Sequence, residues 1–362
     1  MTVGDLRRGT FRRATGGGDD LRAIPEDFAA IAARNPAARP DDPVAYALVQ
    51  GGEAVARARL LSGSVAVDGR ERPVVWDMDL LSKPGHRSSA AGAFLVRGML
   101  SDLEKRGHAV ASFASSPSAL SLYERLSMRT VGKVPRYLFV LGSRPLLRAH
   151  LPEPVPGVAS RVADVGLSWF GRLARARAEW GGDEFEIECI RRFDDEVDDL
   201  AEARPSFARA WIPFDSASLE WRAESMASAG RGRVLDRVYV RHRRSEALVG
   251  YGLLRTRTMD RIVGQPYRDV RATTLVDHFV SSLHPAANLA LAAHVLAVAQ
   301  REKSHVAEVV TTDVDMTRAL RASAFRRVGG FSLSFFGGKT SDASVRLRDW
   351  RVTMAAGDGF MF

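Results

Sequence analysis

The first half of the chain alternates β-prone apolar runs with amphipathic segments. Two apolar runs lie within residues 43–67 and are separated by a Gly-Gly-Glu segment typical of a hairpin turn. Residues 74–81 are almost continuously apolar, which predicts a central strand. Residues 93–107 carry apolar side chains at helical spacing, and after a strand-like run at 108–115 Pro117 opens a second helix. This order predicts an α/β fold with a mixed sheet flanked by helices.

The second half repeats this order. A hairpin is predicted within residues 237–258, followed by a strand at 271–280, a helix at 290–303 and a strand at 305–312. Three prolines within residues 151–157 favour an extended connector between the two copies. The predicted division is a disordered tail (1–20), an N-terminal domain (21–148), a linker (149–158) and a C-terminal domain (159–362).

Composition narrows the class of protein. The single cysteine, Cys189, excludes a disulfide framework within one chain and a Cys-cluster zinc site, and it favours a reducing, cytoplasmic location. No run of 18 apolar residues predicts a membrane span, and the N-terminus lacks the apolar core of a secretory signal. The net charge of +9 would suit a polyanionic partner, but no compact basic run with interleaved aromatics predicts nucleic-acid binding.

The most informative segment is the loop SKPGHRSSAAG, which joins the strand at 74–81 to the helix at 93–107. Small residues let backbone N–H groups approach an anion closely, and a helix N-terminus adds the positive end of its dipole. A strand, a small-residue loop and a helix in this order therefore predict a diphosphate site.

The loop resembles the P-x-x-R/Q-x-x-G-x-G/A signature of the GNAT acetyltransferase superfamily. Arg87 matches the Arg/Gln position and Gly92 the second glycine, whereas Ala90 replaces the first glycine. In that family the loop wraps the pyrophosphate of coenzyme A, and the preceding strand pairs with pantetheine through its backbone. The resemblance thus implies that acetyl-CoA or another acyl-CoA binds at Leu81, Ser82, Arg87, Ser88, Ser89, Ala90, Ala91, Gly92 and Ala93.

Two further matches imply catalytic residues. Tyr123 lies in a segment that resembles the family's A-x-x-L-Y helix, whose tyrosine donates a proton to the departing thiolate, although an ordinary buried tyrosine would also fit. Asp79 stands where many members carry the acid that accepts the amine proton. Because strand side chains alternate, Asp77 is predicted to point to the same face as Asp79, and either could be the base. A solvated pair of carboxylates is the alternative.

The resemblance extends across most of residues 40–142 and weakens in the second half. There the helix MTRALRASAF matches, but the loop SSLHPAANLA has no arginine and no glycine, so a degenerate copy is expected. The implied function is an acyl-CoA-dependent N-acyltransferase, simplest as an N-acetyltransferase, that acts on a small-molecule or peptide amine by direct attack. No metal and no membrane partner is expected, and a homo-oligomer is compatible. The alternatives are a catalytically inactive CoA-binding module, a nucleic-acid binder, and a peptidyltransferase that uses aminoacyl-tRNA.

Overall fold

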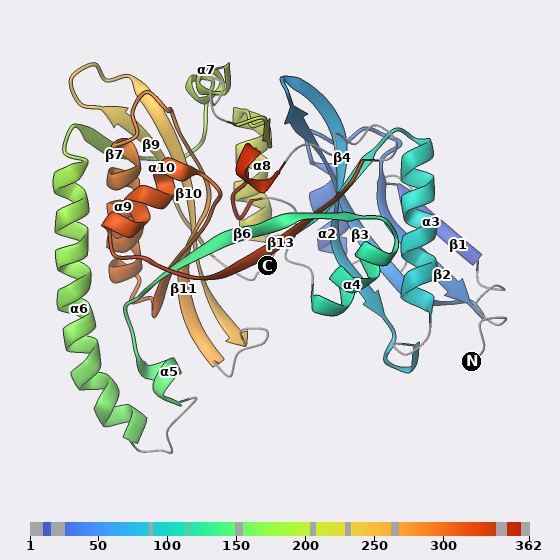
Figure 1. The fold of residues 1–362 in the computed structure, drawn as a ribbon, viewed down its shortest axis with the longest axis horizontal. Helices are drawn as coiled ribbons and strands as arrows, with labels where there is room; N and C mark the ends of the chain where they lie inside the picture. The colour runs from blue at the N-terminus through green and yellow to red at the C-terminus, as the bar shows by residue number, and fades with distance from the viewer. Residues whose placement is uncertain are drawn as a thin grey trace.

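The computed structural model describes residues 10–15, 26–86, 90–113, 116–148, 155–202, 208–228, 233–261, 268–337 and 346–355 (Figure 1). The elements of the first half are β1 (Thr10–Thr15), α2 (Glu26–Ala33), β2 (Pro43–Gln50), β3 (Glu53–Val67), β4 (Arg70–Ser82), the 3-10 helix η1 (Pro84–His86), α3 (Ala91–Lys105), β5 (Ala109–Phe113), α4 (Pro117–Arg125) and β6 (Arg129–Val140).

The second half contains more helices before its sheet begins. Its elements are α5 (Arg144–Arg148), α6 (Val155–Gly181), β7 (Phe185–Ile190), α7 (Glu196–Glu202), β8 (Ala210–Trp211), α8 (Ser216–Ser228), β9 (Arg233–His242), β10 (Leu248–Arg261), β11 (Arg268–Val280), α9 (Ala287–Arg301), β12 (Val306–Val310), α10 (Val314–Ala322), β13 (Arg326–Phe336), η3 (Leu347–Asp349) and β14 (Trp350–Arg351). None of the described helices is both long enough and apolar enough to cross a membrane.

Local chemistry explains several of these boundaries. Gly51 and Gly52 have φ values of +59° and +82°, which the predicted two-residue hairpin turn between β2 and β3 requires. Helix α4 begins where the Ser116 hydroxyl accepts a hydrogen bond from the backbone N–H of Ala119 at 3.2 Å, with Pro117 in the first turn. The predicted α/β fold with mixed sheets is confirmed.

The two halves exchange one strand each and so share a continuous sheet. The strand order is β1-β2-β3-β4-β5-β13-β6-β12-β11-β10-β9-β7. Strand β13 comes from the second half and lies between β5 and β6, while β6 comes from the first half and pairs antiparallel with β12. Figure 1 shows both strands crossing the middle of the molecule, between the half that contains α3 and the half that contains α6.

Two local predictions were wrong. Residues Thr10–Thr15 of the predicted disordered tail form β1, which pairs antiparallel with β2. The linker was expected to be extended up to residue 158, but α6 begins at Val155, and its Pro156 is tolerated in a first turn because no intrahelical donor is needed there. The single cysteine, Cys189, is exposed on β7. Long-range strand pairing and packing on α9 override the local pattern.

A hydrophobic cluster joins the halves on the α2 face of the sheet. It includes Phe28 and Trp76 from the first half, and Trp221 and Trp350 from the second. The indole N–H of Trp221 also donates to the carbonyl of Ile31 at 2.9 Å. On the opposite face of the first half, α3 and α4 cover a separate cluster.

A buried ion pair also spans the junction. Arg136 of β6 donates through Nε to Oε1 of Glu308 on β12 at 2.5 Å, and the hydroxyl of Thr274 donates to Oε2 at 3.0 Å. Glu308 is only 1% exposed. Its hydrogen-bonded cation is therefore supplied from the other half, in addition to the charge of the buried Arg255 nearby.

We expect Arg136→Ala to destabilise the protein by about 3–5 kcal/mol, because it removes the cation that is hydrogen-bonded to the buried carboxylate of Glu308. Urea unfolding of the Arg136→Ala and Arg136→Ala/Glu308→Gln variants measures this. The double variant should recover part of the loss, since it removes the buried charge. Equal stability of wild type and Arg136→Ala would contradict this role.

Candidate functional site

Strands β4 and β5 separate at Asp77. Their parallel pairing runs from Val74, opposite Ala109, to Asp77, opposite Ser112. Strand β4 continues to Ser82 and is paired there on its β3 side. Among the described residues, its β5 side has no strand partner from residue 78 to residue 82. The result is a V-shaped split with an exposed backbone edge, suited to an extended ligand that pairs as an added strand.

Helix α3 starts beside the open end of this split. Ala91 is fully buried, and a Cβ on Gly92 would lie 3.5 Å from the Ser82 hydroxyl. Ala90 is exposed at the N-cap position and offers no capping side chain. The N-cap residue therefore supplies no side-chain acceptor to the first N–H groups of α3.

A β-bulge in β4 separates the two aspartates. Arg59 pairs with Asp79 and the next residue, Leu60, pairs with Asp77, so Met78 is an extra residue on β4. Arg59 and Leu60 are consecutive and point to opposite faces, and each aspartate shares the face of its partner. The prediction that Asp77 and Asp79 point the same way was wrong, because strict alternation holds only without a bulge.

Asp77 lies on the α3–α4 face in contact with Tyr123. The Tyr123 hydroxyl donates a short hydrogen bond to Oδ2 of Asp77, and both residues are almost fully buried. Oδ1 of Asp77 has no hydrogen-bond partner among the described residues. Burial raises the pKa of Asp77 to about 7; the hydrogen bond from Tyr123 opposes this shift and the charge of Asp79 adds to it.

Asp79 lies on the α2 face in an ion pair. Arg59 donates to Oδ2 of Asp79 from Nε at 2.8 Å and also from Nη2. The Arg59 guanidinium lies 4.8 Å from the ring centroid of Phe28 in α2. Oδ1 of Asp79 is buried without a hydrogen-bond partner in the described part of the chain. The split thus has a Tyr–Asp pair on one face and an unpaired carboxylate oxygen on the other.

The predicted cofactor residues are only partly described. Leu81 is 44% exposed on the free edge of β4, with Ser82 next to it. Ala90, Ala91, Gly92 and Ala93 form the start of α3. Arg87, Ser88 and Ser89 lie outside the described residues, so their contact with a diphosphate stays a prediction.

The second half contains the same backbone features. Leu253 pairs with Asp277 and Leu254 with Leu275, which makes Val276 the bulge residue of β11. By this register, Leu275 occupies the position of Asp77 and Asp277 that of Asp79. Sequence reasoning missed Asp277 because it examined the loop after this strand. A strand-by-strand comparison of the two halves could have found it.

Both carboxylate oxygens of Asp277 accept hydrogen bonds from other side chains of the protein. Arg222 donates to its Oδ2 at 2.6 Å and the Thr353 hydroxyl to its Oδ1 at 2.9 Å. Thr353 lies near the end of the last described segment, residues 346–355, and its residues 350–355 cross the split between β11 and β12. Ala355 donates from its N–H to the carbonyl of Val276, and Thr353 bridges to Thr311 just beyond β12. The chain itself therefore fills the second split.

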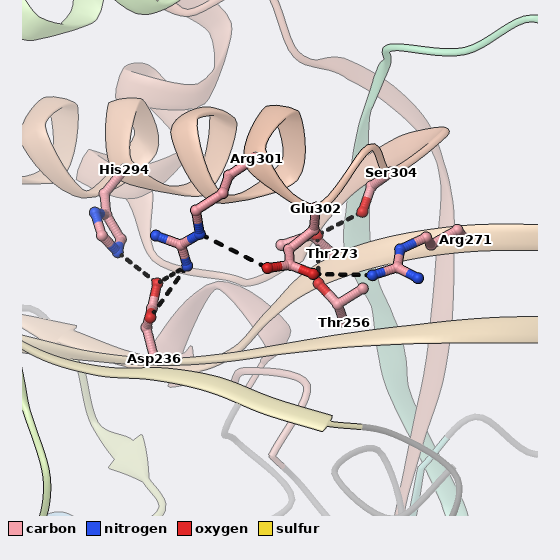
Figure 2. A network of polar contacts seen from close by, with 8 residues as sticks. All are labelled: Asp236, Thr256, Arg271, Thr273, His294, Arg301, Glu302 and Ser304. Carbon is pink, nitrogen blue, oxygen red and sulfur yellow. Dashed lines mark hydrogen bonds and ion pairs between the residues drawn. The ribbon is translucent and has the colours of Figure 1, made fainter.

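Polar side chains also meet between β9 and α9 (Figure 2). Nε2 of His294 and Nη2 of Arg301 both lie 3.1 Å from Oδ2 of Asp236. Cys189 lies close by, so that one potential ligand atom from each of Cys189, Asp236 and His294 falls within 4.8 Å of the others. Arg301 already supplies a positive charge to Asp236. The arrangement is therefore an ion-pair network that joins β9 to α9, with no need for a metal ion.

A cavity of about 360 Å³ lies between the halves on the α2 face. Trp76 on β4 and Gly63 on β3 form one wall, and Phe214 and Trp221 form the other. Asp215 and Glu71 add acidic groups to the lining, and Arg222, which pairs with Asp277, adds a cation. Because Asp277 already compensates Arg222, the aromatic faces and the two carboxylates suit a cationic amine with an apolar body.

Known structures share this architecture. An N-myristoyltransferase from Saccharomyces cerevisiae with bound myristoyl-CoA superimposes with a TM-score of 0.57 at 14% identity, over 91% of this chain and 82% of that chain. A GCN5-related N-acetyltransferase from Kribbella flavida has a TM-score of 0.50 at 14% identity, over 90% of this chain and 71% of that one. A tandem GNAT protein from the clavulanic acid biosynthesis pathway has a TM-score of 0.48 at 13% identity, over 92% of this chain and 100% of its own.

No protein-family model and no curated protein matches the sequence. The predicted tandem GNAT-like fold is nevertheless confirmed by the structural neighbours. At 14% sequence identity these superpositions establish the fold alone. Any inference about the reaction rests on the residues at the split.

The raised pKa of Asp77 predicts a specific pH dependence of stability. The folded state holds this proton up to about pH 7, whereas the ordinary value for aspartate is 3.8, so the free energy of unfolding should fall as the pH rises between these values. The contribution lost is on the order of 4 kcal/mol. The free energy of unfolding of Asp77→Asn, measured in urea and compared with that of wild type, should therefore be more favourable at about pH 8 than at about pH 5. If the difference in free energy of unfolding between the variant and wild type does not change with pH, the raised pKa of Asp77 is contradicted.

Proposed function

We propose that this protein, which shares the fold of N-acyltransferases, transfers an acyl group from an acyl-CoA thioester to an amine. The observation that carries the proposal is the open split between β4 and β5 with Asp77 and Tyr123 hydrogen-bonded at its closed end. An exposed strand edge and a proton-exchanging pair in one place are what thioester aminolysis needs.

In this proposal the acyl-CoA lies along the free edge of β4. Its pantetheine amides pair with the backbone at Leu81 and Ser82, and its diphosphate accepts hydrogen bonds from N–H groups of residues 87–92. Two features of the described residues support this placement: the β5 side of β4 has no strand partner beyond Asp77, and the N-cap residue of α3, Ala90, has no capping side chain. Acetyl-CoA is the simplest donor.

The reaction would use both faces of β4. The amine nitrogen attacks the thioester carbonyl, a C–N bond forms and the C–S bond breaks. Oδ1 of Asp79, directly or through a water molecule, accepts the proton that the amine loses, in keeping with its unpaired state on the α2 face. The departing thiolate takes the hydroxyl proton of Tyr123, which is replaced by the proton of Asp77. A pKa near 7 supports this relay, since Asp77 then exchanges its proton readily at neutral pH.

The inter-half cavity is the proposed place for the body of the acceptor. It lies on the face of Asp79, and Trp76 in its wall is three residues before Asp79 on β4. Three residues of strand span about 10 Å. The proposed acceptor is therefore an elongated amine, with its nitrogen at Asp79 and an apolar or aromatic body between Trp76 and Trp221. Thiol release measured with acetyl-CoA and longer acyl-CoAs against a panel of such amines tests the activity.

Tyr123→Phe should lower kcat about 100-fold with little change in acyl-CoA affinity, because it removes the proton donor and keeps the ring. Tyr46→Phe is the matched control: Tyr46 is also buried and donates to Asp102 at 2.6 Å, away from the split. Steady-state thiol release compares the three proteins. Equal loss in both variants, or no loss in Tyr123→Phe, would remove the general-acid role.

Arg87→Glu should weaken acyl-CoA binding at least 10-fold, because it places a negative charge beside the diphosphate. Arg97→Glu, an exposed charge reversal further along α3, should bind as wild type does. Titration calorimetry should also give one site per chain, since residues 350–355 occupy the second split. Two sites, or equal affinity of all three proteins, would contradict the placement.

Binding and turnover separate this proposal from the inactive alternative. A chain that binds acyl-CoA at one site yet releases no thiol with any amine would be a CoA-binding module. In that case Tyr123→Phe and Asp79→Asn would leave every measured property of the complex unchanged.

A further inference from the structure

One face of α6 exposes a continuous apolar stripe. Of the ten large apolar side chains that are exposed among the described residues, six lie on this helix: Val162, Val165, Trp169, Phe170, Leu173 and Trp180. Trp169 is 62% exposed and Trp180 is 82% exposed. The opposite side of α6, with Gly171, Ala174 and Ala178 buried, packs on α9. The helix therefore presents apolar surface on both sides, and no other element in the described part of the chain covers the outer side (Figure 1).

The area of this stripe is that of an interface. An aromatic side chain offers about 150–250 Å², so the three exposed aromatics leave roughly 300–500 Å² in contact with water. Val162, Val165 and Leu173 add to this and bring the face close to the ~800 Å² per partner that a stable complex buries. An apolar patch of this size on a soluble protein marks an interaction site.

The spacing of the stripe is symmetric about its centre. Its exposed positions are separated alternately by four and three residues, which is the spacing of a helix–helix seam: Val162, Gly166, Trp169, Leu173, Ala176 and Trp180. A second α6 running antiparallel about Gly171 places Trp180 against Val162, and Trp169 against Leu173. These two pairs each combine a large with a smaller side chain, and the third pair, Gly166 with Ala176, lets the two backbones approach closely.

Charges at the two ends of α6 favour the same arrangement. Arg161 lies near its N-terminal end, and the exposed Asp183 and Glu184 directly follow its C-terminal end, where Glu179 already pairs with Arg175 at 3.2 Å. Antiparallel pairing brings Arg161 of each copy close to Asp183 and Glu184 of the other. This pairing of charges and the self-complementary spacing of the seam favour a second copy of the chain as the occupant.

We propose that the protein is a homodimer whose interface is an antiparallel pair of α6 helices, with a two-fold axis that passes between their outer faces at the level of Gly171. The split between β4 and β5 lies in the other half of the molecule, so the dimer leaves the proposed acyl-CoA site open (Figure 1). This inference is independent of the proposed chemistry.

Sedimentation of the full chain at micromolar concentration should give the mass of two chains. Trp169→Glu should halve that mass, because it places a charge in the centre of the apolar seam. Ser168→Glu is the matched control: it adds the same charge at the neighbouring exposed position, outside the stripe, and should remain dimeric. Circular dichroism verifies that both variants keep the helix content of wild type. A monomeric wild type, or a Trp169→Glu variant with the mass of two chains, would overturn the proposal.

Disulfide trapping tests the direction of the helices. In a Cys189→Ser background, mixing Val162→Cys chains with Trp180→Cys chains should give a cross-linked heterodimer on oxidation, and neither variant alone should cross-link. Cross-linking within Val162→Cys alone would indicate parallel helices and would overturn the antiparallel pair.

Vesicles of phosphatidylserine and phosphatidylcholine test whether the apolar stripe of α6 binds a membrane surface instead of a second chain. The dimer should not sediment with them. Monomeric wild type that sediments with the vesicles, and loses this property in Trp169→Glu, would assign the stripe to a membrane surface and overturn the dimer.

Discussion

The exchange of β6 and β13 is the constraint on which the candidate site depends. Every buried backbone N–H and C=O group needs a partner, and each half of this chain satisfies part of its sheet with a strand from the other. Helix α4, which carries Tyr123, connects β5 to β6 and contacts both β6 and β13. The position of Tyr123 against Asp77 is therefore set by a strand that arrives about 200 residues later in the chain. The halves cannot fold or act as independent modules without losing this geometry.

The two halves use one backbone design for different purposes. Both contain a bulge in the strand before the long helix, at Met78 and at Val276, and both pair the aspartate after the bulge with an arginine. In the first half the residue before the bulge is Asp77, and the split beside it has an open edge. In the second half that position is Leu275, and residues 350–355 fill the split. Side-chain chemistry and occupancy, more than backbone shape, distinguish a candidate active site from a structural copy.

Electrostatics within the first half follow from the same bulge. Turning Asp79 to the α2 face lets Arg59 compensate it, while Asp77 remains enclosed with Tyr123 as its hydrogen-bond donor. Two carboxylates one residue apart on a regular strand would share a face and repel each other. Separated by the bulge, they have different environments, and burial leaves Asp77 with a pKa near neutrality.

Local pattern determined much of this protein: the order of strands and helices, the β2–β3 turn with its positive-φ glycines and the small-residue loop before α3. The resemblance to a family motif, in turn, selected Asp79 and Tyr123 as candidates. Period and turn chemistry act over a few residues, so they can be read from the chain. Tertiary structure alone decided the opposed faces of Asp77 and Asp79, the exchange of β6 and β13, the contacts of Asp277 and the outward face of α6. Each of these depends on pairing or packing between residues far apart in sequence. A single inserted residue or a borrowed strand changes them without altering the local pattern.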